Sequence, residues 1–188
     1  MKFATKAIHA GVHPDPATGA IMTPIYQTST YVQTSPGKNQ GFEYSRTHNP
    51  TRSQLQNAVA ALDNGKHGLA FATGMAAIDC VMKLLKPGDE VISTNDLYGG
   101  SYRLFTKVYE PYGIKFHFVP MHDMAAVRAM VSEKTKLIWV ETPPIRCSIS
   151  SILPPPLPWP RKPARCWPLI TRSARPTCKP PWIWGPTS

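Results

Sequence analysis

The chain has 188 residues, enough for one domain with a sizeable core, and a formal net charge of +10. No stretch approaches the roughly 20 apolar residues of a membrane span, and the first residues lack the apolar run of a secretion signal. We therefore expect no membrane span. The histidines show no ligand spacing, which predicts no metal site, and nothing in the cysteines indicates a disulfide framework. A cytoplasmic location is the default expectation.

Residues 1–48 show no sustained periodicity and are rich in Pro, Gly and Thr, which predicts an extended N-terminal arm. Asn49 and Pro50 then form a typical helix start, an N-cap residue followed by proline at the first helical position. Apolar residues recur at helical spacing as far as Leu62, and Asn64-Gly65 predicts the end of that helix.

Strands and helices are expected to alternate after this point. The patterns predict strands at 68–72, 90–93, 114–119 and 136–141, and helices at 75–85, 101–112 and 123–132. This order indicates an α/β fold, a mainly parallel sheet with helices on both faces, over residues 49–143. Ligands bind beyond the carboxyl ends of such strands, where Gly74 and Tyr98 and the segment after Glu141 are expected.

Gly74 and Met75 are expected where a strand gives way to a helix. The first N–H groups of a helix have no partner within it and favour a phosphate, and glycine lets the anion approach closely. A turn without a ligand is the alternative. Tyr98 follows a strand in a glycine-rich loop, where its ring could stack on a flat ligand or be a half-buried loop residue.

Three arginines extend this pattern. Tyr44 and Arg46 combine a phenol with a guanidinium fork, which suits phosphate recognition, although a solvated surface arginine is the alternative. Arg103 lies on an amphipathic helix, where it is either a substrate ligand or a surface charge. Arg52 is either a partner of the Tyr44 loop or a charge at a helix end.

The amino-acid sequence at residues 44–52, 73–77 and 96–101 resembles that of the pyridoxal-phosphate enzymes of the transsulfuration family. This group includes cystathionine γ-synthase and γ-lyase. The resemblance runs from about Ile8 to Pro143 and implies the first part of a fold-type I transferase large domain. It implies that Gly74 and Met75 bind the cofactor phosphate, and that Tyr98 stacks on the pyridine ring and takes part in proton transfer. The cofactor would be pyridoxal 5′-phosphate.

The same resemblance implies an oligomer, a tetramer made of two catalytic dimers. In the family, the residues matching Tyr44 and Arg46 bind the phosphate of the neighbouring subunit, and Arg103 matches a residue that contacts a substrate carboxylate. Gly100 stands where methionine γ-lyases carry a cysteine, which argues against that branch. The reaction implied is γ-replacement or γ-elimination on cystathionine or on an activated homoserine.

The resemblance ends at Pro143. Residues 144–188 contain 12 of the 21 prolines and 7 basic residues but no acid, because all 11 acidic residues lie at or before Glu141. So much proline does not suit a parallel sheet. Ile145 stands where the family has asparagine, and neither the aspartate that pairs with the pyridinium nitrogen nor the Schiff-base lysine can be assigned here.

A lost nucleotide just before codon 144 explains this tail. Moving the reading frame back one base lets Pro144 to Cys147 encode Thr-Asn-Pro-Met, the continuation of the family motif, and makes Cys166-Trp167-Pro168 give Leu-Ala whichever cysteine codon is used. We therefore expect residues 144–188 to be a non-native, disordered tail, and the chain as written to lack activity.

Two other functions fit the composition. The basic tail could contact nucleic-acid phosphates, although it has neither the repeats nor the Gly and Ser content of basic arms. The chain could also be an inactive fragment that acts only as a structural partner. The resemblance argues for the enzyme, with a small amino-acid substrate and with no nucleic acid or membrane as partner.

The frameshift explanation predicts the DNA sequence. When the coding strand is read one base back from codon 144, it should encode Thr-Asn-Pro and contain no stop codon through codon 188, because this would be the original reading frame. A genuine tail would give no reason to expect a second open reading frame there. Sequencing the gene checks this. A stop codon at the Cys178–Lys179 junction in that frame would contradict it.

Overall fold

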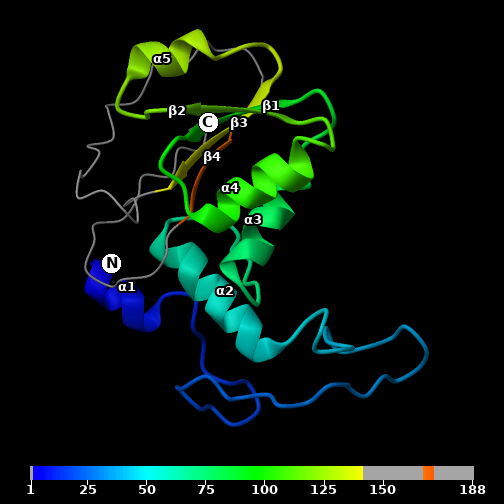
Figure 1. Cartoon of the computed structure of the whole chain (residues 1–188). Coiled ribbons are helices and arrows are strands. Elements are labelled where there is room, and N and C mark those ends of the chain that lie inside the picture. The colour runs from blue at the N-terminus through cyan, green and yellow to red at the C-terminus, as the bar shows by residue number, and fades with distance from the viewer. Residues whose placement is uncertain (1, 142–166, 172–188) are drawn as a thin grey trace. The chain divides into compact units, whose positions relative to one another are not determined.

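The structure is a computed structural model that describes residues 2–141 and the strand at 167–171. The chain divides into two compact units, and the described residues fall into them as 2–70 and as 71–141 with 167–171. Figure 1 shows the elements of both units in chain order.

The first unit holds two helices, α1 (Phe3–His9) and α2 (Pro50–Leu62), joined by a long irregular segment. The predicted start of α2 is confirmed: Asn49 is the N-cap, and its side chain accepts hydrogen bonds from the N–H groups of Thr51 and Arg52. Asn64 ends this region with a positive φ of 54°. Helix α1 was not predicted within the arm, because it is only seven residues long and buries no side chain.

The second unit is a four-stranded sheet with helices. Its elements are α3 (Gly74–Met82), β1 (Glu90–Thr94), α4 (Gly99–Leu104), the π-helical turn η1 (Phe105–Tyr109), β2 (Lys115–Val119), α5 (Met124–Ala129), β3 (Thr135–Glu141) and β4 (Trp167–Thr171). The strand order is β2-β1-β3-β4, and all neighbouring pairs are parallel. The α/β fold with a parallel sheet is therefore confirmed.

Alternating residues of the strands build two hydrophobic cores, one on each face of the sheet. Val91, Leu137 and Trp139 pack with residues of α3 and η1, whereas Ile92 and Ile138 pack with residues of α5. In Figure 1 the sheet accordingly lies between α5 on one side and α3 with α4 on the other. The predicted cover of helices on both faces is confirmed.

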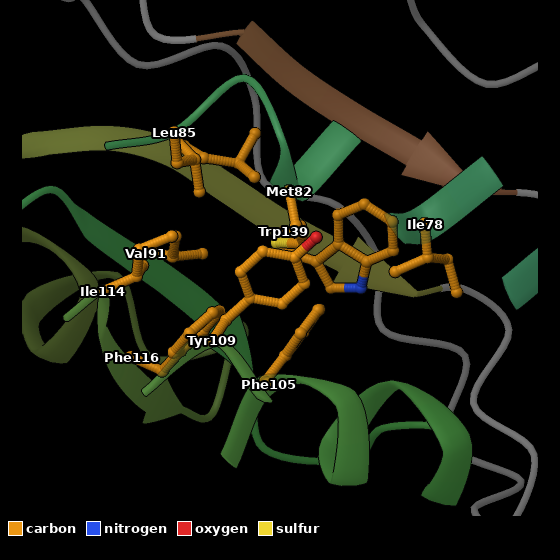
Figure 2. Close-up of a cluster of buried hydrophobic side chains, with 10 residues drawn as sticks. Ile78, Met82, Leu85, Val91, Phe105, Tyr109, Ile114, Phe116 and Trp139 are labelled. Carbon is orange, nitrogen blue, oxygen red and sulfur yellow. The ribbon is translucent and has the colours of Figure 1, made fainter. Parts of the chain in front are cut away.

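The larger core centres on three aromatic rings. Phe105 stacks on Phe116 with 4.7 Å between ring centroids and meets Trp139 edge-on at 5.7 Å. Phe105 and Trp139 are fully buried, and Figure 2 shows both within the cluster. Truncating such a ring typically costs about 3–5 kcal/mol, so this contact fixes the end of α4 firmly on the sheet.

Three expectations need correction. Residues 68–72 form no strand, and Leu69 is 75% exposed, because nothing pairs with this segment in the described chain: the N–H of Ala70 donates to the side chain of Gln56 instead. The helix predicted over 101–112 changes to a π-helical turn at Phe105, where the N–H of Glu110 donates to the Phe105 carbonyl.

The third correction concerns the proline-rich segment. It was expected to supply no strand, yet Trp167–Thr171 pairs in parallel with β3. Strand β4 is last in the order, and an edge strand tolerates a proline such as Pro168 because only one of its sides is hydrogen-bonded. The expectations for 142–166 and 172–188 lie outside the described residues.

Candidate functional site

The N-terminus of α3 presents unpaired backbone donors. Gly74 is the first residue of the helix, as predicted, and Thr73 is its N-cap. The Thr73 hydroxyl oxygen accepts from the N–H of Ala76 at 3.1 Å, and its carbonyl accepts from the N–H of Ala77 at 3.2 Å. Within the described residues, the N–H groups of Gly74 and Met75 have no acceptor, so they are free to bind an anion.

The approach to Gly74 is open. A Cβ atom placed on this residue would meet no atom within 4 Å, and Gly74 is exposed while Met75 is half-buried. An anion could therefore reach the helix terminus without displacing any part of the described chain. The helix dipole adds a further favourable term for negative charge there.

Tyr98 lies beside this terminus. It is the N-cap of α4 and follows the carboxyl end of β1, and its side chain is 46% exposed. A Cβ on Gly100 would lie 2.3 Å from Cε1 of Tyr98 and 2.9 Å from Sδ of Met75. Gly100 thus allows the Tyr98 ring and the Met75 side chain to converge. The structure brings together Met75, Tyr98 and Gly100.

Arg103 lies one turn into α4 and is exposed. Its Nη1 atom would lie 3.5 Å from a Cβ on Gly99, so the guanidinium folds back over the start of the helix. No carboxylate in the described part of the chain pairs with it. Arg103 therefore keeps its charge available for an anionic ligand.

Tyr44 and Arg46 lie in the first unit and contact each other. The guanidinium carbon of Arg46 lies 4.8 Å from the centroid of the Tyr44 ring, a cation–π contact. Arg52 holds the intervening backbone by donating to the carbonyls of Ser45 at 3.1 Å and Thr47 at 2.6 Å. Of its two predicted roles, Arg52 thus serves the Tyr44 loop. In the described chain Arg46 itself has no carboxylate partner.

Sequence reasoning missed Glu141, which ends β3. Its carboxylate accepts a hydrogen bond of 2.7 Å from the backbone N–H of Tyr98. The signal was present, since an acidic residue stood at the carboxyl end of a predicted strand. Its partner, 43 residues away in sequence, could not be foreseen.

A second hydrogen-bonded group fixes α3 to η1. The hydroxyl of buried Tyr109 donates to Oδ1 of Asp79 at 2.7 Å, and Lys83 pairs with the same carboxylate at 2.8 Å. Lys83, followed by Tyr109, lowers the pKa of Asp79. Burial, followed by the hydrogen bond to Asp79, raises the pKa of Tyr109 to about 12.

A metal cluster needs several ligand side chains close together, and a membrane-spanning helix must be long and apolar. The described residues contain no group of three or more His, Cys, Asp or Glu side chains placed to share a metal ion. Across the same part of the chain, no helix is both long and apolar enough to cross a membrane.

Residues 4–150 match the Cys/Met metabolism PLP-dependent enzyme family. The chain belongs to this family. It is 54% identical over 141 residues to a probable cystathionine gamma-synthase of Herpetosiphon aurantiacus, covering 75% of this chain and 44% of that protein. It is 55% identical over 140 residues to a cystathionine beta-lyase of Coxiella burnetii, covering 74% and 36%.

A solved structure agrees with these relatives. Cystathionine gamma-lyase from Lactobacillus plantarum complexed with L-serine superimposes with a TM-score of 0.72 at 47% identity, covering 77% of this chain and 38% of that one. The chain therefore spans less than half the length of the relatives it matches. The cofactor of the family is pyridoxal phosphate, which confirms the cofactor expected from the sequence.

Tyr109 gives a pH-dependent prediction. Its pKa is about 12 in the folded chain and about 10 when unfolded, so its contribution to stability is complete below pH 10 and is lost as the pH rises towards 12. We expect Tyr109→Phe to lower the free energy of unfolding by about 1 kcal/mol at pH 8, and the difference from wild type to shrink by pH 11.5. Urea unfolding at both pH values measures this, and a pH-independent difference would contradict it.

Proposed function

We propose that this chain supplies the phosphate-binding and ring-stacking part of a pyridoxal-phosphate site, in an enzyme that acts on sulfur amino acids. The observation that carries the proposal is the convergence of the α3 terminus with the Tyr98 ring: unpaired N–H groups at Gly74 and Met75, with Met75 and Tyr98 meeting over Gly100. A phosphate beside a flat heteroaromatic ring needs this combination of donors and a stacking surface.

The residues fit the cofactor. The N–H groups of Gly74 and Met75 would hold its phosphate, and the half-exposed ring of Tyr98 would lie on its pyridine ring. When bound, pyridoxal phosphate supplies an electron sink for breaking bonds at the α carbon of an amino acid. The Tyr98 hydroxyl would hold a proton near the reacting atoms, and Arg103 would bind a substrate carboxylate.

Tyr44 and Arg46 would complete the phosphate site of a second subunit. Their loop is held by Arg52, which leaves the Arg46 guanidinium free for an anion. This role requires an oligomer, and we propose a tetramer of two catalytic dimers. We propose a cytoplasmic location, in keeping with amino-acid metabolism.

The reaction we propose is γ-replacement or γ-elimination on cystathionine or an activated homoserine. The relatives named above share about the same identity with this chain and carry the names of a γ-synthase, a β-lyase and a γ-lyase. We infer that the shared segment binds the cofactor and that residues elsewhere select among reactions. For the chain as written, the inactive structural fragment is the second candidate, because no Schiff-base lysine can be assigned in it.

The phosphate site can be tested at Gly74. Proline at the first helical position preserves a helix but removes one N–H, and the extended backbone of Thr73 suits a following proline. We expect Gly74→Pro to weaken binding of pyridoxine 5′-phosphate by about tenfold, the scale of one charge-assisted hydrogen bond. Calorimetry with the 188-residue chain measures this, and the ligand has no aldehyde to react with surface lysines.

Two controls accompany this variant. Gly74→Ala keeps the N–H and adds only a methyl group that meets no atom of the described chain, so it should bind more tightly than Gly74→Pro. Pyridoxine, which has no phosphate, should bind wild type and Gly74→Pro equally. An equal loss for both ligands would show that the proline disturbs the fold and does not remove a phosphate contact.

The role of Arg46 is tested in the full-length enzyme with its reading frame restored. Arg46→Ala should weaken cofactor binding by about 1.5–3 kcal/mol, since a charged hydrogen bond to phosphate is lost. The affinity of the wild-type enzyme should fall on dilution below the dimer dissociation constant, whereas that of Arg46→Ala should depend less on dilution. Equal cofactor affinity in wild type and variant would remove Arg46 from the site.

A further inference from the structure

The carboxylate of Glu141 is bonded by three different donors. Its Oε2 accepts from the backbone N–H of Tyr98 at 2.7 Å. Its Oε1 accepts from the Ser101 hydroxyl at 2.5 Å and from the indole Nε1–H of Trp139 at 3.1 Å. Ser101 and Trp139 are fully buried, so this carboxylate is held in a fixed orientation.

These donors tie the start of α4 to the end of β3. Tyr98 is the N-cap residue of α4 but has no side-chain capping bond, and Ser101 lies in the first turn of the helix. Glu141 bonds both, so it takes the place of a cap that the helix does not provide for itself. Trp139, two residues earlier on β3, bonds the same oxygen as Ser101 and is itself locked in the aromatic core.

Glu141 therefore fixes the backbone of Tyr98, and contact with Gly100 fixes the position of the Tyr98 ring. The ring lies against Gly100, which also lies against Met75 at the phosphate-binding terminus. Among the described residues, the bond to Glu141 is the hydrogen bond that joins the Tyr98 backbone to the sheet. If that bond were lost, the ring could move away from Met75.

We propose that Glu141 is a positioning residue for the cofactor site: its carboxylate holds the Tyr98 loop so that the Tyr98 ring faces the space beside the Gly74–Met75 terminus. This inference rests on the proposed function, because the ring matters for binding only if a flat ligand occupies that space. Glu141 itself touches neither the ligand nor the reacting atoms.

The hydrogen-bond pattern calls for an acceptor at each of the two side-chain oxygens of Glu141. Three donors converge on two oxygens, and a carboxylate is an acceptor at both. A glutamine of the same shape must turn its NH₂ either towards the Tyr98 N–H or towards the Trp139 indole N–H, and neither of these groups can accept a hydrogen bond. Glu141→Gln therefore loses either the Tyr98 bond or the Trp139 bond, whereas Glu141→Ala removes both acceptor oxygens and with them all three hydrogen bonds.

The test measures two properties of the 188-residue chain. We expect Glu141→Ala to accelerate amide hydrogen exchange at Tyr98 at least tenfold and to weaken binding of pyridoxine 5′-phosphate by about tenfold, while exchange at buried Val91 stays unchanged. Ser101→Ala, which removes one donor but keeps the Tyr98 bond, should change both properties by less. If exchange at Val91 also rises, Glu141→Asp replaces Glu141→Ala, because it keeps the carboxyl group but is too short to reach all three donors.

The outcomes separate the two proposals. Faster exchange at Tyr98 with unchanged ligand affinity overturns the positioning role, and so does unchanged exchange at Tyr98. In either case the proposed function stands if Gly74→Pro still weakens binding. If neither Glu141→Ala nor Gly74→Pro alters binding, the proposed cofactor site falls as well, and the positioning role with it.

Discussion

The parallel pairing of β1 with β3 is the constraint on which the rest of the second unit depends. Residues Glu90 to Ser93 pair with Thr135 to Trp139, so both strands end at the same edge of the sheet. The loop carrying Tyr98 leaves one strand there, and Glu141 ends the other. The carboxyl ends of two neighbouring strands lie at the same edge of a sheet only when the strands are parallel.

The aromatic core makes that edge rigid. Phe105 joins α4 and η1 to the sheet through Phe116 and Trp139, and Trp139 in turn bonds the Glu141 carboxylate. Helix α4 is thus held at its end by buried rings and at its start by a charged acceptor. With only one of these two restraints the helix could rotate about the fixed end. Because both ends are held, the position of Tyr98 at the start of the helix is fixed.

Polar groups in this chain fall into two classes. Glu141, Asp79 and Arg52 are satisfied by partners in the chain, and they fix backbone segments. In contrast, within the described residues, the N–H groups of Gly74 and Met75 have no acceptor and the Arg46 guanidinium has no carboxylate. These unpaired N–H groups and the Arg46 guanidinium all favour an anion, and this shared preference is what a phosphate-binding site requires.

The sequence by itself determined the features set by near neighbours. Asn49 with Pro50 predicted one helix start because capping acts within three residues, and Gly74 with Met75 predicted a second. Apolar patterns predicted the strands at 90–93, 114–119 and 136–141, and the alternation of strands with helices predicted a sheet covered on both faces. The sequences of the motifs at 44–52, 73–77 and 96–101 indicated the family, and the family indicated the cofactor.

Only the tertiary structure decided the features that need distant partners. Residues 68–72 look like a strand but have no neighbour to pair with, while Trp167–Thr171 contains a proline yet forms an edge strand. The three donors on Glu141 and the contact of Tyr98 with Gly100 and Met75 likewise join segments that no local pattern connects. The physical reason is that capping and periodicity act over a few residues, whereas strand pairing and burial depend on which segments the fold brings side by side.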